Sequence, residues 1–187
     1  ILAISLTLAA IATAGCGGVE DRVKLAHDLA RGGGMSGQVV DAGPFSLPAF
    51  YRPATQAGSL RVYVEGDGFA WISRRRVSPD PTPHDPVALR LAVADRRGGV
   101  LYVARPCQYV GVGTNRRCHP RYWTSHRFAP EVIEATGNVI DQVKKAVNAR
   151  TVELIGFSGG GAVAILVAAR RSDVVSIRTV AGNLDHV

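Results

Sequence analysis

The residues best suited to covalent chemistry lie at positions 156–160, where Gly-Phe-Ser-Gly-Gly joins two apolar segments. The segment before it predicts a buried strand over 151–155, and the Ala-rich segment after it predicts a helix that begins at once. The pattern G-x-S-x-G between a strand and a helix is typical of a nucleophile elbow, a strained turn that projects its serine hydroxyl from the carboxyl edge of a sheet. We therefore predict that Ser158 is a nucleophile.

Two other interpretations of this turn stay open, a tight structural turn and a phosphate-binding loop. Three consecutive glycines after Ser158 offer free backbone amides, as a phosphate cradle does. A Walker-type loop has a lysine directly after its glycines, and none follows here. The nucleophile is favoured because the motif stands between a strand and a helix. The first amides of the predicted helix, beginning with that of Gly159, would also face the hydroxyl.

A second glycine-rich segment, Glu65-Gly66-Asp67-Gly68-Phe69, follows a predicted strand. In acyl-transfer sites one oxyanion donor follows the nucleophile and another comes from the loop after an early strand. The amides of Gly159 and Asp67 are the predicted donors, Gly68-Phe69 is the alternative, and a simple turn is the structural interpretation. Residues expected to bind substrate are Gly66, Gly68, Phe69 and Phe157.

The first fifteen residues carry no charge and end in Thr13-Ala14-Gly15-Cys16. This segment is too short to span a bilayer comfortably and predicts a signal peptide over 1–15. The four residues are similar to a bacterial lipobox, which predicts lipidation of Cys16, export to the cell envelope and anchoring to a membrane. The alternative is a plain signal peptide that is cleaved at a neighbouring small residue.

The remaining cysteines, Cys107 and Cys118, form an even pair in what would be an oxidising compartment, which predicts a disulfide rather than two free thiols. No cysteine and histidine spacing indicates a metal site, and no cofactor is expected. The net charge of +7 comes from basic residues scattered in twos and threes. No nucleic-acid-binding module contains them, so attraction to anionic lipid is favoured over nucleic-acid binding.

The periodicity of apolar residues predicts an α/β fold. Strands are expected over 45–51, 59–65, 98–104, 151–155 and 175–180, and helices over 19–31, 86–93, 129–149 and after Ser158. The first two strands are expected to form an antiparallel opening, with Pro48 marking an edge strand. The alternation of strand and helix from Pro86 onward predicts a mostly parallel sheet with helices on both faces.

The sequence resembles the α/β-hydrolase superfamily and, more narrowly, its bacterial lipoprotein branch. The segments that carry this resemblance are VYVEGDGFAW (62–71), DPTPHDPVALRLA (80–92), ARPCQYV (104–110), CHPRYWTSHRFAPEV (118–132), GFSGGGAVA (156–164) and AGNLDH (181–186). The resemblance implies that Ser158 attacks an ester, amide or thioester carbonyl after losing its proton to a histidine, and that water releases the acyl group.

The resemblance also implies an acid and a histidine that follow the serine in the chain. After Ser158 the sequence offers Asp173, Asp185 and His186. A histidine directly after Asp185 cannot easily bridge it to the serine, so a structural turn is favoured for this pair, and His126 precedes the serine. We therefore expect a partial α/β-hydrolase domain over 16–187 that lacks its C-terminal strands and its acid and base.

Two classes of function remain open from the sequence. The first is a cell-envelope serine hydrolase that acts on a small ester or acyl substrate. The second is a non-catalytic envelope lipoprotein that uses the same fold to bind a ligand or partner.

Overall fold

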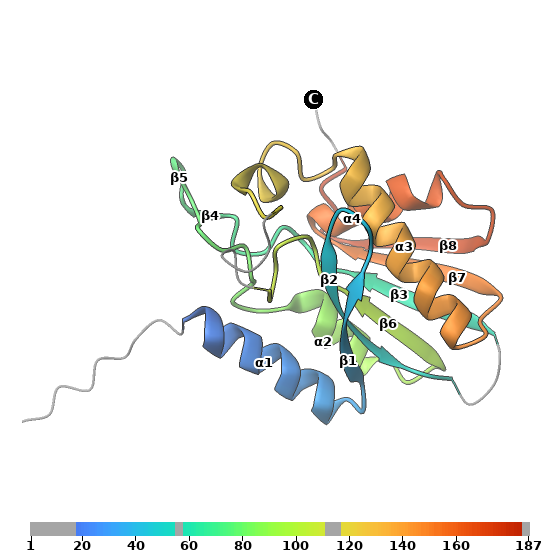
Figure 1. The fold of residues 1–187 in the computed structure, drawn as a ribbon. Coiled ribbons are helices and arrows are strands. Elements are labelled where there is room, and N and C mark those ends of the chain that lie inside the picture. The colour runs from blue at the N-terminus through green and yellow to red at the C-terminus, as the bar shows by residue number, and fades with distance from the viewer. Residues whose placement is uncertain (1–17, 55–57, 111–116, 185–187) are drawn as a thin grey trace, which may run out of the picture.

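The structure is a computed structural model that describes residues 18–54, 58–110 and 117–184 (Figure 1). Its main sheet has six strands in the order β1-β2-β6-β3-β7-β8, and β4 and β5 form a separate hairpin. The strands are β1 (Ser36–Asp41), β2 (Ser46–Arg52), β3 (Ser59–Val64), β4 (Trp71–Ser73), β5 (Arg76–Val77), β6 (Gly99–Val103), β7 (Thr151–Phe157) and β8 (Val174–Val180). The helices are α1 (Val19–Gly32), α2 (Val87–Ala94), α3 (Pro130–Ala146) and α4 (Gly159–Ala168), with the 3-10 turn η1 (Pro120–Trp123).

The predicted α/β class and mixed sheet are confirmed. Strand β3 pairs in parallel with β6 and β7, and β7 pairs in parallel with β8. Strands β1 and β2 are antiparallel, and β2 is also antiparallel to β6. The parallel strands bring their carboxyl ends to one edge of the sheet, where the loop after β3 and the turn after β7 meet.

The predicted position of β2 is wrong in two respects. Strand β1, which the sequence analysis did not predict, covers the side of β2 that Pro48 was expected to leave at an edge. Strand β6 lies between β2 and β3, so the two opening strands are not neighbours. Pro48 fits inside the sheet because its carbonyl accepts a hydrogen bond from the amide of Ala104 at 3.0 Å, a role that needs no proline N–H.

Helices cover both faces of the sheet, as predicted (Figure 1). Helices α3 and α4 pack on one face, and α1 and α2 pack on the other. Alternation along β3 accounts for this arrangement, because Leu60, Val62 and Val64 enter the first core and Tyr63 enters the second. The resulting two-sided burial holds the carboxyl ends of β3 and β7 in fixed positions.

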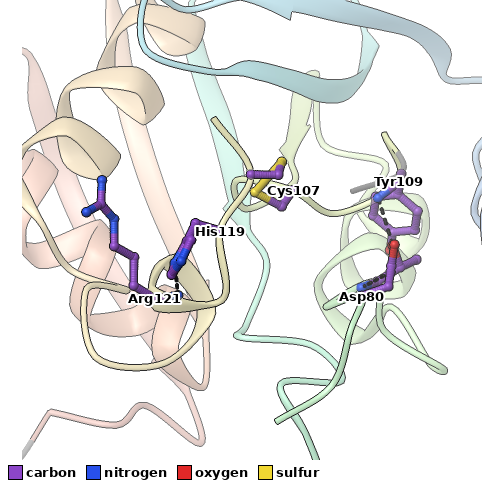
Figure 2. Close-up of a disulfide and its surroundings, with 7 residues drawn as sticks. Asp80, Cys107, Tyr109, His119 and Arg121 are labelled. Carbon is purple, nitrogen blue, oxygen red and sulfur yellow. Dashed lines mark hydrogen bonds between the residues drawn. A yellow bond between two sulfur atoms is a disulfide. The ribbon is translucent and has the colours of Figure 1, made fainter. Parts of the chain in front are cut away.

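Cys107 and Cys118 form the disulfide that the sequence predicts, with Cα atoms 5.4 Å apart. Figure 2 shows it at Cys107, between Tyr109 and His119. Cys107 is fully buried and packs with Ala70 and Trp123 in a small third core. This core attaches the loop after β6 to the loop after β3.

Several predictions fall outside the residues that the structure describes. They concern the signal peptide over 1–15, lipidation of Cys16, and the turn that holds Asp185 and His186. In the described ranges, no helix has the length and apolar character that crossing a bilayer requires.

Candidate active site

Ser158 lies at the junction of β7 and α4 with φ 50° and ψ −122°, a conformation that L residues rarely adopt. Two glycines make this sharp turn possible. A Cβ on Gly156 would lie 2.2 Å from the carbonyl oxygen of Gly160, and a Cβ on Gly160 would lie 2.4 Å from that of Glu65. The spacing G-x-S-x-G is therefore a steric requirement of this backbone.

The end of β8 holds the elbow in place. The amide of Ser158 donates to the carbonyl of Val180 at 2.9 Å. The carbonyl of Ser158 accepts from the amides of Gly161 at 2.9 Å and Asn183 at 3.1 Å. These bonds offset the strain at Ser158 by satisfying its backbone polar groups.

The loop after β3 lies directly against the elbow. A Cβ on Gly66 would lie 3.2 Å from the Cβ of Ser158, so a glycine there lets the two segments approach. The side-chain amide of Gln108 donates to the carbonyl of Gly66 at 3.0 Å and fixes the loop from the other side. Gly68 has φ +68°, and a Cβ there would lie 2.0 Å from the carbonyl oxygen of Pro81.

The hydrogen bonds of this loop decide which amides can serve as oxyanion donors. The amide of Gly66 donates to the carboxyl of Glu65 at 3.0 Å, and that of Phe69 donates to the carbonyl of Pro81 at 3.0 Å. Phe69, part of the alternative donor pair, is therefore already engaged. The amides of Asp67, Gly68 and Gly159 have no acceptor among the described residues, so Gly68 stays open as an alternative donor.

The side chain of Asp67 packs over the first residue of α4. A Cβ on Gly159 would lie 2.4 Å from a carboxylate oxygen of Asp67. Arg105 approaches this carboxylate at 3.2 Å and Arg127 at 3.5 Å. Two guanidinium groups thus balance the negative charge of Asp67, which would otherwise disfavour an oxyanion at this place.

Glu65 is a buried carboxyl that the sequence analysis did not assign to the site. One of its oxygens accepts from the amides of Gly66 and Ala88, and the other is 3.2 Å from the hydroxyl of Tyr102. Tyr102 is in turn 3.3 Å from the hydroxyl of Tyr109. Burial raises the pKa of Glu65, although hydrogen bonds from the backbone and from Tyr102 oppose this effect. The side chain therefore joins the loop after β3 to the first turn of α2.

A cavity of about 270 Å³ opens at this place. Its lining contains five residues predicted for the site by the sequence (Gly66, Asp67, Gly68, Phe69 and Phe157), together with Ser158. The other lining residues are Glu65, Pro83, His84 and Asp85.

His84 has an exposed side chain that nevertheless takes part in the cavity wall. Its ring meets that of Phe69 edge to face with centroids 4.4 Å apart. The polar segment 72–85 suggested a loop that could border the pocket, but the contact with Phe69 depends on how the loop folds.

The described residues include no histidine that is hydrogen-bonded to the hydroxyl of Ser158. Asp173 does not belong to this site, because it precedes β8 at the amino edge of the sheet, whereas Ser158 follows β7 at the carboxyl edge. Asp173 instead pairs with Arg171 and Lys144, whose hydrogen bonds lower the pKa of Asp173 to about 2. Within the described ranges, no group of three or more His, Cys, Asp or Glu is arranged to hold a metal ion.

The sequence matches no family model and no curated protein. Solved structures with a similar fold include a protein of unknown function from Agrobacterium tumefaciens that is assigned to the α/β hydrolases. It has a TM-score of 0.56 and 12% identity over 79% of this chain and 60% of that one. A lipase candidate from Acinetobacter baumannii has a TM-score of 0.51 and 16% identity over 92% of this chain and 48% of that one.

An acylaminoacyl peptidase from Pyrococcus horikoshii has a TM-score of 0.52 and 12% identity over 79% of this chain and 22% of that one. The chain thus spans 60% or less of the length of these three proteins. Identities this low establish the fold and leave the activity open. The described residues have the α/β-hydrolase fold.

Proposed function

We propose that the protein is a serine hydrolase that transfers an acyl group from a small ester or related carbonyl substrate to water. The observation that carries this proposal is the strained Ser158 in a cavity beside the amides of Asp67 and Gly159, neither of which has an acceptor among the described residues. Strained backbone at a residue that can act as a nucleophile is a feature of catalytic sites.

In this mechanism the oxygen of Ser158 attacks the substrate carbonyl while its proton passes to a base, which we place outside the described residues. The amides of Gly159 and Asp67 donate to the oxyanion of the tetrahedral intermediate. Collapse of the intermediate breaks the bond to the leaving alcohol, which takes the proton from the base, and leaves an acyl group on Ser158. Water then attacks the acyl group while the base takes its proton, the carboxylic acid is released, and the proton returns to Ser158.

The cavity favours a small substrate. A volume of about 270 Å³ lies at the lower end of ligand sites in proteins. Phe69, Phe157 and Pro83 provide apolar walls that suit a short acyl chain. We further propose that the protein is exported and anchored through lipidated Cys16, as its N-terminal sequence predicts.

Hydrolysis of p-nitrophenyl acetate and butyrate by the full-length protein tests this function. Ser158→Ala should lower kcat on the order of a thousandfold or more, because no nucleophile remains. Ser172→Ala is the matched control, since this exposed serine lies in the turn before β8, and it should leave the rate unchanged. Equal rates for the wild type and Ser158→Ala would contradict the proposal.

The second candidate, a non-catalytic envelope protein, is favoured by one observation, the lack of a histidine bonded to Ser158 in the described ranges. The same assay distinguishes the two, because a binding protein with this fold would show no turnover that depends on Ser158.

A further inference from the structure

The hairpin formed by β4 and β5 projects from the body of the molecule (Figure 1). It exposes both apolar and basic side chains. Trp71 is 46% exposed and Ile72 is 39% exposed. These neighbouring residues of β4 give the hairpin a partly exposed apolar surface.

Three arginines occupy the tip. Arg74 and Arg75 form the turn, and Arg76 begins β5. All three side chains are exposed, and none has an ion pair with another described residue. Single exposed apolar residues are common on protein surfaces, but a tryptophan and an isoleucine next to three unpaired arginines form an unusual combination.

The base of the hairpin is firmly attached. The amide of Ser78 donates to the carbonyl of Ala70 at 2.9 Å, and the indole N–H of Trp123 donates to the carbonyl of Ser78 at 3.1 Å. Val77 packs against the small core around the disulfide at Cys107. A two-stranded hairpin is marginally stable alone, so these contacts are what keep the exposed end in place.

Phe69, which precedes the hairpin in the chain, connects it to the cavity and to the start of α1. Phe69, two residues before Trp71, lines the cavity. The guanidinium of Arg22, in the first turn of α1, lies 5.7 Å from the centroid of the Phe69 ring. In the view of Figure 1 the hairpin and the start of α1 are on the same side of the molecule.

We propose that this hairpin is a membrane-docking element, in which Trp71 and Ile72 enter the interface of an anionic lipid surface and Arg74, Arg75 and Arg76 bind headgroup phosphates. Tryptophan is favoured at the boundary between headgroups and acyl chains because it has an apolar body and a polar N–H. Arginine pairs with phosphate through two parallel N–H groups, and each basic residue near an anionic surface strengthens binding about fivefold. Docking at this hairpin would place the cavity wall at Phe69 beside the lipid.

Quenching of tryptophan fluorescence by brominated acyl chains tests the proposal directly. The full-length protein is added to vesicles of phosphatidylglycerol and phosphatidylcholine that carry the bromine label, and to vesicles of labelled phosphatidylcholine alone. Trp71 should be quenched in the anionic vesicles, whereas Trp123, which is 2% exposed, should not. Trp71→Phe should therefore remove the quenched component while keeping an aromatic ring on the hairpin.

The variant with Arg74→Gln, Arg75→Gln and Arg76→Gln should need on the order of a hundredfold more anionic lipid for half-maximal quenching. The matched control is Lys145→Gln, Arg150→Gln and Arg170→Gln, which removes the same charge from exposed positions on α3 and in the turns that follow α3 and α4, and it should behave as the wild type.

Three results would overturn the proposal. The first is equal quenching of Trp71 in neutral and anionic vesicles. The second is an equal loss of binding to anionic vesicles in the two triple variants. The third is tight binding of a single-stranded oligonucleotide through the three arginines while lipid leaves Trp71 unquenched. None of these readouts needs turnover, so they are independent of whether Ser158 is a nucleophile.

Discussion

At the scale of single residues, the turn at Ser158 needs glycine at 156 and 160, because backbone atoms there leave no room for a Cβ. The four residues around Ser158 could be assigned from the sequence because the steric demands of this turn act on neighbours in the chain. The contacts of Glu65 and His84 could not be assigned, because Ala88 in α2, Tyr102 in β6 and Phe69 in the loop after β3 come near them only when the chain is folded.

Gly160→Ala should abolish activity and destabilise the fold by several kcal/mol. The added Cβ would lie 2.4 Å from two backbone carbonyl oxygens, those of Val64 and Glu65, and backbone cannot move aside as a flexible side chain can. The control is Gly137→Ala in α3, where a Cβ meets nothing within 4 Å and helix propensity predicts a gain of up to about 1 kcal/mol. Urea unfolding of both variants checks the pair, and a stable, active Gly160→Ala protein would contradict this view of the elbow.

Glu65→Ala should lower kcat/KM on the order of a hundredfold with little change in KM, because the loop that carries the Asp67 amide loses its attachment to α2. Glu65→Gln retains an acceptor for the amides of Gly66 and Ala88 and should restore most of the activity. An equal loss of kcat/KM in Glu65→Ala and Glu65→Gln would show that the carboxyl has a role other than positioning the loop.

The same residue predicts a dependence of stability on pH. The pKa of Glu65 is raised in the folded state, so the folded protein binds its proton more tightly than the unfolded chain does. The stabilisation that protonated Glu65 contributes is complete below the ordinary pKa of about 4.5. It is lost as the pH rises through the pKa of Glu65 in the folded state. The difference in unfolding free energy between Glu65→Gln and the wild type should therefore grow as the pH rises from about 4 toward neutral.

At the scale of elements, Asp95 joins the end of α2 to β3. Its carboxylate accepts from Arg61 at 2.6 Å and from the hydroxyl of Tyr63 at 2.8 Å, and Arg97 adds a third partner at 3.1 Å. Burial alone would raise the pKa of Asp95, but the hydrogen bonds from Arg97, Tyr63 and Arg61 outweigh it and hold the pKa well below its usual range. The ionised form is thus favoured by folding.

Asp95→Asn should destabilise the protein by about 3 kcal/mol, because the buried Arg61 would lose its counter-charge. In the wild type this stabilisation is complete above the ordinary pKa of about 4 and is lost as the pH falls through the folded value. Asp85→Asn is the control, since the ion pair of Asp85 with Arg90 is exposed and should be worth under about 1 kcal/mol. Thermal unfolding at pH 7 and pH 3 checks both variants. If the stability difference between the wild type and Asp95→Asn does not shrink at pH 3, the role assigned to the Asp95 carboxylate is contradicted.

Most helices and strands could be predicted from the sequence. The position of β2 in the sheet was predicted wrongly, and the reason is physical. Buried strands such as β3, β6 and β7 have apolar runs that mark them clearly, and α3 has a clear apolar stripe. Strand β1 has an exposed pattern with Val40 as its buried residue, so its local sequence shows little alternation. Its partner β2 therefore looked like an edge strand until the pairing was known.

At the scale of the whole molecule, the disulfide links the loop after β6 to the segment before α3. Replacing Cys107 and Cys118 with serine should lower the unfolding free energy by about 2–3 kcal/mol through the larger entropy of the unfolded chain. Because Cys107 packs with Ala70 and Trp123 below the β4–β5 hairpin, protease cleavage at the hairpin should also become faster. Unchanged cleavage would show that the hydrogen bond from Trp123 holds the hairpin without the disulfide.

The most direct test of the proposed function is covalent labelling of the full-length protein with a fluorophosphonate, followed by mass spectrometry of the modified peptide. The account predicts one adduct on Ser158, formed far faster in the wild type than in Glu65→Ala and absent from Ser158→Ala. A protein that remains unlabelled under conditions in which a known esterase reacts completely, or that carries its adduct on another serine, would contradict the assignment of Ser158 as the nucleophile.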